Sequence, residues 1–565
     1  MTTHDPQLLN QGLRAARRNA IRTLLRSVFG VEHLRDGQRQ VIDQVLDGRD
    51  TLAIMPTGSG KSLCYQIPAR LLDGTTIVVS PLISLMKDQL EKLDALGIRA
   101  AQLNSSLSRE EEEAALDGLR HSGHEIVFCT PERLAMPGFL ELLKRVKVAL
   151  MVIDEAHCIS QWGHDFRPAY LELAASIDAL GRPPLLALTA TATDEVVADI
   201  GKQLGRPRIG VVNTGIYRPN LRYRVLQVTN ADEKTAQALE LVRQSAGVGI
   251  VYAATVKAAE ELHQALLDAG EDATLYHGKL HAAERKQNQD LFMNGARRVM
   301  VATNAFGMGI DKPDTRFVLH LQIPANLEAY YQESGRAGRD GEDADCTLLF
   351  LQDDKRVQQF FLVKHYPQAA ELKAVYERVA QLAKEGPVSF DALGEGDEEL
   401  PAQKIKVGLK LLKDGRLLRQ NRKLGYLLTA TVPRAALYRE LADIYAQKRA
   451  RDRDALEQMV SYAVSGFCRW KVLLDYFGDP LEGFERCCKC DNCVNPPLLE
   501  LSGIRDDEFE PDAPSAPEPL FAVGARVKVP KFEVGTVQAV AGDQVTIAFP
   551  DRSTRTFLAE YVAPA

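Results

Sequence analysis

The sequence predicts a multidomain α/β fold with two parallel β-sheets, and three observations lead to it. The chain has 565 residues, which is long for a single hydrophobic core. Short apolar runs alternate with helical stretches up to about residue 210, which is typical of a parallel sheet flanked by helices. The same alternation repeats over a second segment. We therefore expect two similar sheets, followed by smaller parts of different composition.

The expected strands fall into two groups. In the first domain, 1–212, they are 51–55, 75–80, 125–129, 148–153 and 185–190. In the second domain, 213–365, they are 248–252, 273–276, 298–302, 316–321 and 345–350. Tyr217–Asn220 lies between the two groups, and we interpret it as a linker.

The composition is that of an ordinary globular protein, with 45% hydrophobic and 26% charged residues. The net charge of −7 neither indicates nor excludes a nucleic-acid partner, because a basic groove can lie on an acidic protein. No apolar run is long enough to span a membrane. The N-terminal segment lacks the apolar block of a signal peptide, so we expect a cytoplasmic protein, with a transit peptide as the alternative. Its arginines are Arg14, Arg17, Arg18, Arg22 and Arg26.

A glycine loop, Met55–Ser62, follows the first expected strand. Its glycines let the backbone turn tightly and aim N–H groups at an anion, and the helix that begins there adds its positive dipole end. Lys61 is placed to reach the outer phosphates, and the Ser62 hydroxyl to hold Mg²⁺. Although Met55 replaces the first glycine of the usual pattern, the loop predicts a nucleotide site. Its residues are Thr57, Gly58, Ser59, Gly60, Lys61 and Ser62. Because the second sheet has no such loop, we expect one nucleotide between the two sheets.

An acidic pair, Asp154 and Glu155, follows the strand at 148–153. The carboxyl end of a parallel strand is the usual place for ligand chemistry. We expect Asp154 to hold Mg²⁺ and Glu155 to act as general base or to orient the attacking water. The alternative is that the pair is solvated surface.

The loop Cys158–Pro168 is polar but contains aromatic residues beside this acidic pair. Aromatic rings stack on bases, and arginine pairs with phosphate. We therefore expect a DNA-sensing role for Trp162, His164, Phe166 and Arg167. The alternative is that the rings are buried in the core.

Three further motifs carry candidate residues. Thr189–Thr193 closes the first sheet, where its hydroxyls could couple the two domains or cap the next helix. Arg336 and Arg339 are three residues apart and could reach across the cleft to the γ-phosphate, unless they form a solvated pair. Gln38, just after Arg35, could read the adenine edge, although a surface turn is equally consistent with those residues.

Six stretches together closely resemble the RecQ DNA helicases of superfamily two. They are Met55–Ser62, Ser80–Gln89, Asp154–Pro168, Thr189–Thr193, Val301–Asp311 and Gln332–Gly341. The resemblance covers roughly residues 20 to 365, with a further piece near 455–493. It implies two RecA-like domains, ATP hydrolysis, 3′→5′ movement on single-stranded DNA and duplex separation.

The resemblance also implies roles for single residues. Arg35 and Gln38 would contact the adenine, and Asp311 would belong to the nucleotide site. Gln332 would join the two arginines in catalysis. Val31 stands where the family usually has an aromatic that stacks on the adenine, so only apolar contact is expected there.

Residues 366–440 depart from the order usual in that family. A basic amphipathic helix pattern at Ile405–Lys413 is followed by a hairpin pattern at Gly415–Thr429. This predicts a winged-helix-like domain, related to helix-turn-helix DNA readers, with a helical spacer as the alternative.

Residues 441–496 predict a helical zinc module. Cys468, Cys487, Cys490 and Cys493 offer four thiolates with two C-x-x-C steps, which fits tetrahedral Zn²⁺. With no open position the ion should be structural, and Cys488 should point away from it. The four cysteines elsewhere in the chain are expected in the core.

The C-terminal part combines a linker and a small barrel. Residues 497–519 are rich in Pro, Asp and Glu and predict a flexible linker. Residues 520–565 alternate apolar and polar residues and predict an SH3/Tudor-like barrel of about five strands. It resembles the tail of UvrD-type helicases, which is associated with RNA polymerase contact, but a generic barrel with another partner is equally consistent.

Taken together, the sequence predicts a monomeric ATP- and Mg²⁺-dependent 3′→5′ DNA helicase of repair or recombination that acts on single-stranded and duplex DNA. An RNA helicase is one alternative. The other is an ATP-gated DNA clamp tethered to a partner by residues 520–565.

Overall fold

The protein is described by a computed structural model that divides into two units, Met1–Pro497 and Leu498–Ala565. The described residues are 6–35, 37–121, 123–160, 167–307, 310–365, 367–384, 386–394, 402–421, 425–429, 433–479, 481–496, 521–529, 534–541, 544–550, 554–558 and 562–565. No helix in these ranges is long and apolar enough to cross a membrane.

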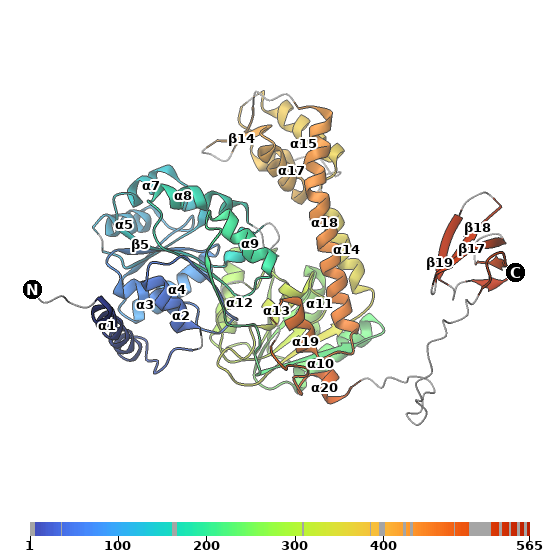
Figure 1. The fold of residues 1–565 in the computed structure, drawn as a ribbon, viewed down its shortest axis with the longest axis horizontal. Helices are drawn as coiled ribbons and strands as arrows, with labels where there is room; N and C mark the ends of the chain where they lie inside the picture. The colour runs from blue at the N-terminus through green and yellow to red at the C-terminus, as the bar shows by residue number, and fades with distance from the viewer. Residues whose placement is uncertain are drawn as a thin grey trace, which may run out of the picture. The chain divides into compact units, whose positions relative to one another are not determined.

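The first domain contains a seven-stranded sheet in the order β3-β4-β2-β5-β6-β1-β7 (Figure 1). All of its strand pairs are parallel, and the central strands are buried. Such burial on both faces is expected when helices cover a parallel sheet. The strands are β1 (Thr51–Ile54), β2 (Thr75–Val79), β3 (Ala100–Leu103), β4 (Ile126–Cys129), β5 (Val148–Ile153), β6 (Leu185–Thr189) and β7 (Gly210–Asn213).

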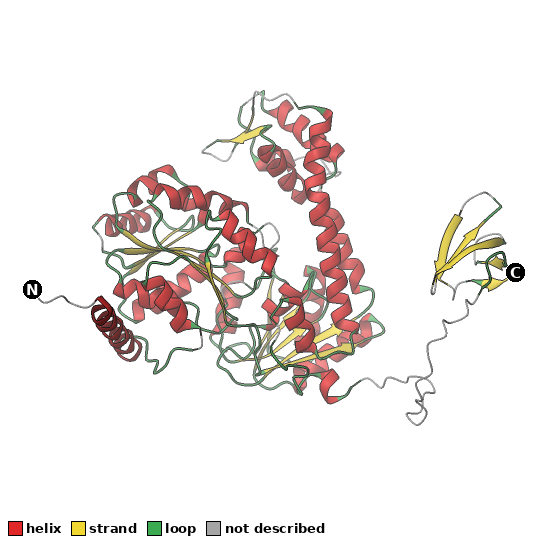
Figure 2. Cartoon of the chain, viewed as in Figure 1, coloured by secondary structure: helices red, strands yellow, loops and turns green. Residues whose placement is uncertain are grey.

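Helices flank this sheet on both sides (Figure 2). They are α1 (Pro6–Ser27), α2 (Gln38–Leu46), α3 (Leu63–Leu71), α4 (Ile83–Ala95), α5 (Arg109–Arg120), α6 (Pro131–Leu134), α7 (Pro137–Leu143), α8 (Leu173–Ala179) and α9 (Asp194–Gln203), with short 3₁₀ turns at Ala156–Ile159 and Pro168–Glu172.

The second domain repeats this architecture with six parallel strands in the order β10-β11-β9-β12-β13-β8. Its strands are β8 (Leu221–Gln227), β9 (Val248–Tyr252), β10 (Ala273–Tyr276), β11 (Val299–Ala302), β12 (Thr315–His320) and β13 (Ala344–Phe350). Its helices are α10 (Ala231–Gln244), α11 (Val256–Asp268), α12 (Ala282–Met293) and α13 (Leu327–Ser334). The expectation of two parallel-sheet domains is therefore confirmed.

Every expected strand is found within one residue of its expected bounds, but three strands were missed. They are β3, β7 and β8, which lie at the edges of the two sheets. An edge strand buries only part of its surface, so β7 is mostly exposed and β8 alternates buried and exposed residues. The long apolar runs that reveal central strands are therefore missing there.

The segment Tyr217–Asn220 joins the two sheets, and it is held in place by its own side chains. Arg218 is buried and donates to the carbonyls of Gly335, Ala337 and Gly338 at 2.6–2.8 Å. The Tyr217 ring packs edge-on against Trp470 at 5.0 Å. The linker therefore fixes the turn after α13.

A helical hairpin with an inserted segment follows the second sheet. α14 (Asp354–His365) packs beside the later half of the 30-residue α18 (Ala435–Val464), and Lys355 pairs with Glu457 at 2.7 Å. Between these helices lie α15 (Ala369–Leu382), α16 (Phe390–Gly394), α17 (Ala402–Asp414) and the antiparallel pair β14 (Leu418–Gln420) and β15 (Tyr426–Leu428). The domain boundary expected at residue 440 falls inside α18.

The cysteine-rich segment packs against the second sheet. α19 (Arg469–Tyr476) and α20 (Asp491–Val494) contact β8, and Trp470 Nε1 donates to the Leu221 carbonyl at 3.1 Å. Arg469 forms an ion pair with Asp491, whose carboxylate also accepts from the Val225 N–H. One hydrophobic core therefore serves both the sheet and this module.

The C-terminal unit contains a five-stranded antiparallel sheet in the order β19-β18-β17-β16-β20. The strands are β16 (Arg526–Lys528), β17 (Gly535–Ala541), β18 (Gln544–Ala548), β19 (Thr554–Leu558) and β20 (Ala563–Pro564). It has its own apolar core around Val527, Val545 and Ile547. Closure into a barrel is not confirmed, since no pairing of β19 with β20 is found in the described part. The expected linker, 497–519, lies outside the described residues.

Removing the Arg218 guanidinium should destabilise the first unit. We expect Arg218→Met to lower the free energy of unfolding by about 2–4 kcal/mol, because three buried carbonyls lose their donor. Urea unfolding followed by circular dichroism measures this. The matched control is Arg222→Met, an arginine on β8 that is 45% exposed and pairs with Asp345. Equal stability of the two variants would contradict a structural role for Arg218.

Candidate nucleotide site and metal centre

The glycine loop joins the buried strand β1 to α3, as the sequence predicts. Gly58 and Gly60 have φ of +81° and +76°, a conformation that favours glycine. A Cβ on Gly60 would lie 2.7 Å from Gln38 Nε2, so a side chain there would also displace that amide. Position 60 of the loop therefore favours glycine both because its φ is positive and because the Gln38 amide lies close by.

Gln38 and Arg35 hold this loop from outside. The Gln38 amide, 1% exposed, donates to the carbonyls of Ser59 at 2.8 Å and Gly60 at 3.0 Å. It also accepts from the Arg35 N–H at 2.7 Å, and the Arg35 guanidinium donates to the Gly58 carbonyl. These residues are therefore more than a surface turn, and they border the phosphate loop. Val31 packs in the apolar cluster beneath them.

Lys61 and the acidic pair meet below the loop. Lys61 Nζ donates to the carbonyls of Met55 at 3.0 Å and Pro56 at 3.3 Å. Burial lowers the pKa of Lys61, and the Glu155 and Asp154 carboxylates oppose that shift. Burial, together with the charge of Glu155, raises the pKa of Asp154 to about 7. Such a perturbed carboxyl beside a lysine is typical of a functional site, and both Asp154 and Glu155 are half-buried rather than fully solvated.

The acidic motif, Asp154 to His157, is hydrogen-bonded to Thr189 at the end of β6. Glu155 adopts a left-handed backbone with φ +49°, which is strained for this residue type. His157 Nδ1 lies 3.0 Å from Thr189 Oγ1, and that hydroxyl donates to the Thr191 carbonyl at 2.9 Å. The threonine motif therefore contacts the acidic motif directly. The Thr193 side chain forms no capping hydrogen bond at the start of α9, so the alternative role of this motif as a helix cap is not found at Thr193.

The turn after α13 brings arginines to the phosphate loop from the second domain. A Cβ on Gly58 would lie 3.4 Å from Arg339 Cα, and one on Gly335 would lie 3.6 Å from Thr57 Cβ. Arg336 is buried and the Arg339 side chain is 15% exposed, so the two arginines are not a solvated pair. A Cβ on Gly307 would lie 3.0 Å from Arg336 Nη2. Gln332, one turn before Arg336, is half-buried on α13.

Asp311 connects Arg339 to the first domain. One carboxylate oxygen accepts from Arg339 at 2.9 Å, and the other from Lys92 of α4 at 2.5 Å. Burial opposes the charge on Asp311, but Arg339 and Lys92 outweigh it and lower the pKa of Asp311. Each of the two Asp311 carboxylate oxygens therefore accepts a hydrogen bond from a cationic side chain.

The aromatic loop lies mostly outside the described residues, including Trp162, His164 and Phe166. Arg167 is described, and its guanidinium donates to the Pro81 carbonyl at 3.0 Å. Pro81 stands just before α4, so the end of the aromatic loop contacts the start of that helix.

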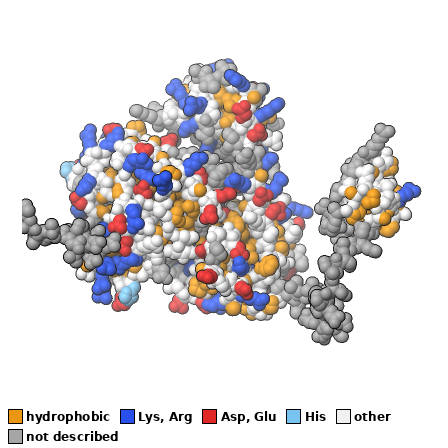
Figure 3. All heavy atoms as spheres, in the orientation of Figure 1, with side chains coloured by type: hydrophobic (Ala, Val, Ile, Leu, Met, Phe, Trp, Pro, Cys, Tyr) orange, Lys and Arg blue, Asp and Glu red, His pale blue; other side chains and the backbone are white. Residues whose placement is uncertain are grey.

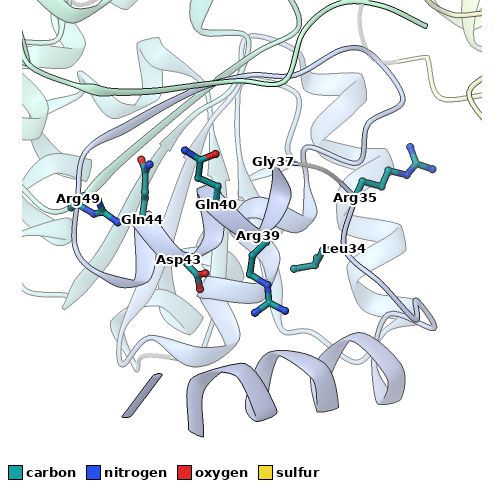
Figure 4. Close-up of a pocket in the computed structure, with 8 residues that line it drawn as sticks. All are labelled: Leu34, Arg35, Gly37, Arg39, Gln40, Asp43, Gln44 and Arg49. Atoms are coloured by element: carbon teal, nitrogen blue, oxygen red, sulfur yellow. The ribbon is translucent and has the colours of Figure 1, made fainter. Parts of the chain in front are cut away.

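A cavity of about 630 Å³ lies along the outer face of α2 (Figure 4). It is lined by Leu34, Arg35, Gly37, Arg39, Gln40, Asp43, Gln44 and Arg49. None of these described residues belongs to the phosphate loop, and in Figure 4 the Arg35 side chain points away from the others. The cavity adjoins the phosphate loop at Arg35, whose guanidinium donates to the Gly58 carbonyl.

Four cysteine sulfurs form the candidate metal centre. The Sγ atoms of Cys468, Cys487, Cys490 and Cys493 all lie within 4.8 Å of one another. Backbone N–H groups donate to three of them: Cys487 N to Cys468 Sγ, Cys490 N to Cys487 Sγ and Arg469 N to Cys490 Sγ, at 3.2–3.4 Å. Such donors stabilise thiolates, and four sulfurs without an open position fit structural Zn²⁺.

The fifth cysteine of this segment, Cys488, is exposed and has φ +57°. It lies outside the cluster, as expected. Cys64, Cys129, Cys158 and Cys346 are buried in the two sheet domains.

Three family models match the chain. The DEAD/DEAH box helicase model matches residues 35–200, the helicase conserved C-terminal domain model matches 233–341, and the RecQ zinc-binding model matches 435–494. The ATP-dependent DNA helicase RecQ of Synechocystis sp. is 35% identical over 494 residues, which cover 85% of this chain and 99% of that protein. This chain belongs to the RecQ family. The family resemblance expected from the motifs is confirmed.

Other RecQ relatives match over shorter parts of the chain. RecQ of Bacillus subtilis is 48% identical over 342 residues, and RecQ of Pasteurella multocida is 42% identical over 327 residues. The chain spans 58% and 51% of these two relatives' lengths. The roles of residues outside the matched parts therefore do not follow from these two relatives.

Solved structures support the fold. The helicase Lhr of Mycobacterium smegmatis, bound to single-stranded DNA and AMP-PNP, matches 75% of this chain and 61% of its own, with a TM-score of 0.51 and 22% identity. The DUF1998 helicase MrfA, bound to DNA, matches 74% and 63%, with a TM-score of 0.50 and 18% identity. At this identity the likeness shows the arrangement of the sheets only.

Sequence reasoning missed some residues that shape the RecQ-family site. Arg218 holds the turn after α13 that carries Arg336 and Arg339, which we call the arginine turn. Tyr170 donates from its hydroxyl to the Asp154 carbonyl at 3.2 Å. Lys92 reaches Asp311 from the other domain. Arg218 and Lys92 were missed because their partners lie 117 and 219 residues away along the chain. Tyr170 was missed because its partner, 16 residues earlier, is a backbone carbonyl that no side-chain pattern marks.

Zinc content should separate the clustered cysteines from Cys488. We expect Cys490→Ser to lose bound Zn²⁺ and to lower the melting temperature, because the module shares its core with the second sheet. Cys488→Ser should keep about one Zn²⁺ per chain. Metal analysis of the purified proteins measures both. Loss of zinc from Cys488→Ser, or its retention in Cys490→Ser, would contradict the assigned cluster.

Proposed function

We propose that this chain is an ATP- and Mg²⁺-dependent DNA helicase that moves 3′→5′ on single-stranded DNA and separates duplexes in repair or recombination. The observation that carries the proposal is the contact of Arg339 with Gly58, where the arginine turn of one sheet meets the phosphate loop of the other. A nucleotide held there touches both domains, so its hydrolysis can change their arrangement. Membership in the RecQ family, whose relatives in Synechocystis and Bacillus subtilis are ATP-dependent DNA helicases, supports the choice of DNA.

Each candidate residue then has a role. The loop from Thr57 to Ser62 holds the phosphates, with Lys61 on the outer ones. Asp154 and Ser62 would hold Mg²⁺, which supplies charge neutralisation on the phosphates. Glu155 accepts the proton of the attacking water, and its fixed backbone aims its carboxylate. Gln332, Arg336 and Arg339 stabilise the charge that develops on the γ-phosphate.

The residues at the start of α2 would bind the nucleoside end of ATP. Arg35 and Gln38 border the loop, and an amide carries the donor and the acceptor that an adenine edge requires. In the nucleotide-free structure the Gln38 donor serves the Ser59 and Gly60 carbonyls and its acceptor serves the Arg35 N–H, so contact with adenine requires that these bonds exchange. Asp311 completes the site from the second domain.

DNA contacts are proposed for two regions. The aromatic loop, with Trp162, His164, Phe166 and Arg167, would couple DNA binding to the acidic motif. The inserted segment between α14 and α18 would act as a winged-helix-like domain. Its element order of α15, a bridge at Val388, α16, α17 and the β14–β15 hairpin supports this.

Charge supports the same role for the insertion. Residues 402–439 include ten basic residues and only one acidic residue, Asp414, in a chain whose net charge is −7. The basic residues are Lys404, Lys406, Lys410, Lys413, Arg416, Arg419, Arg422, Lys423, Arg434 and Arg439. Several Lys and Arg side chains are exposed at the top of Figure 3, where this segment lies. Such an excess favours a phosphate backbone as partner.

A second candidate function is an ATP-gated DNA clamp tethered to another protein. It is favoured by the C-terminal sheet, which forms a separate unit with its own core. The partner would bind that sheet, and RNA polymerase is the candidate suggested by the likeness to UvrD-type tails. The relatives include bacterial RecQ proteins, which supports a cytoplasmic protein at the nucleoid. We also propose that the protein acts as a monomer.

ATP hydrolysis should depend on Lys61 and respond to DNA. We expect Lys61→Ala to abolish DNA-stimulated turnover, because no other cation of the loop can reach the outer phosphates. A coupled ATPase assay with single-stranded DNA or RNA measures this. The control Lys147→Ala removes a 68%-exposed lysine of the same domain and should leave the rate unchanged. Retained turnover in Lys61→Ala would refute the site, and stimulation by RNA alone would favour an RNA helicase.

A further inference from the structure

Four side chains of alternating charge connect α4 of the first domain to the arginine turn of the second. Asp88 pairs with Lys92 at 2.9 Å, and Lys92 pairs with Asp311 at 2.5 Å. Asp311 in turn pairs with Arg339 at 2.9 Å. Arg339 ends this series where it touches Gly58 of the phosphate loop.

Arg339 depends on Asp311 for its position. Its side chain is only 15% exposed, and its guanidinium lies near two further cations, Arg336 and Arg218. Burial and these like charges lower the pKa of Arg339, while Asp311 acts in the opposite direction. Among the described residues Arg339 Nε has no hydrogen-bond partner, so the contact to Asp311 through Nη1 sets the direction of the side chain.

Asp311 in turn is fixed from the opposite domain. Its second oxygen is free of Arg339 and accepts from Lys92, which is the contact that crosses between the sheets. Asp88 holds Lys92 one helical turn earlier on the same face of α4. At its other end α4 follows Pro81, whose carbonyl accepts from Arg167 of the aromatic loop. The segment that leads into α4 therefore contacts the aromatic loop, and Lys92 near the end of α4 contacts Asp311, the partner of Arg339.

We propose that Lys92 is a positioning residue for hydrolysis. By holding Asp311 from across the domain boundary, it directs Arg339 to the phosphate loop and makes the rate depend on the position of α4. The inference deepens the proposed function and rests on it, because it assigns the regulation of the same site. It differs from a stability role, since Lys92 and Asp311 are 45% and 38% exposed and such pairs contribute little to folding.

The expected effect is moderate. An ion pair of this exposure supports a change of about threefold to fivefold, well below the loss of about a thousandfold or more that removal of a catalytic arginine causes. We expect Lys92→Gln to lower kcat for ATP about threefold to fivefold in the absence of DNA, with KM nearly unchanged. Lys92→Arg should restore the wild-type rate, because it keeps the charge.

The matched control is Lys87→Gln. Lys87 lies on α4, is 58% exposed and approaches only Glu91 of its own helix, at 3.8 Å. The substitution makes the same change in net charge without touching the domain boundary. A loss in Lys87→Gln equal to that in Lys92→Gln would overturn the proposal, as would an effect on KM alone.

A double-mutant comparison tests whether Lys92 acts through Arg339. In an Arg339→Ala background, single-turnover hydrolysis should be equally slow with Lys92 or Gln at this position. A further threefold loss in the double variant would show that Lys92 acts by another route and would overturn the proposal.

A readout independent of activity separates this inference from the proposed function. A carbodiimide should join Lys92 to Asp311 through an amide bond in the nucleotide-free protein, and mass spectrometry of the digest should find the linked peptides. The control protein Lys92→Arg should not give them. Absence of the link in the wild type would overturn the inference even if ATP is hydrolysed. A link without any ATP hydrolysis would instead overturn the proposed function.

Discussion

The contact between the arginine turn and the phosphate loop is the constraint on which the rest of the structure depends. Gly58 has a φ of +81°, which favours glycine, and a Cβ there would lie in van der Waals contact with Arg339 Cα, at 3.4 Å. The turn keeps its shape because Arg218 binds three of its carbonyls. A site divided between two sheets responds to their relative movement, and this division is what a motor requires.

The cysteine module supports this arrangement without entering the chemistry. Trp470 lies between Tyr217 of the linker and Tyr223 of β8, with ring centroids 5.0 Å from each. Asp479 accepts from the Ile216 N–H at 2.6 Å, just before the linker. A metal held by the four cysteines would therefore stabilise the segment that holds Arg218, which in turn holds the turn carrying Arg336 and Arg339. A closed four-sulfur centre is suited to such a structural role.

The sequence was sufficient wherever a short segment determines its own structure. The loop Met55–Ser62, the strand that precedes Asp154 and the C-x-x-C steps could be identified because their spacing encodes the geometry. Edge strands such as β8 were missed because they are only partly buried, and Lys92 was missed because its partner lies 219 residues away. Closure of the C-terminal sheet and the role of the inserted segment stay predictions, since both depend on packing that local patterns do not determine.

Strand separation on tailed duplexes tests the central claim most directly. The substrate is a DNA duplex with a single-stranded tail at either its 3′ or its 5′ end, mixed with the full chain, ATP and Mg²⁺. The account predicts separation from the 3′ tail only. If neither duplex is separated while ATP hydrolysis is still stimulated by DNA, the helicase account is contradicted and the tethered clamp is favoured. Separation from the 5′ tail alone would contradict the proposed direction.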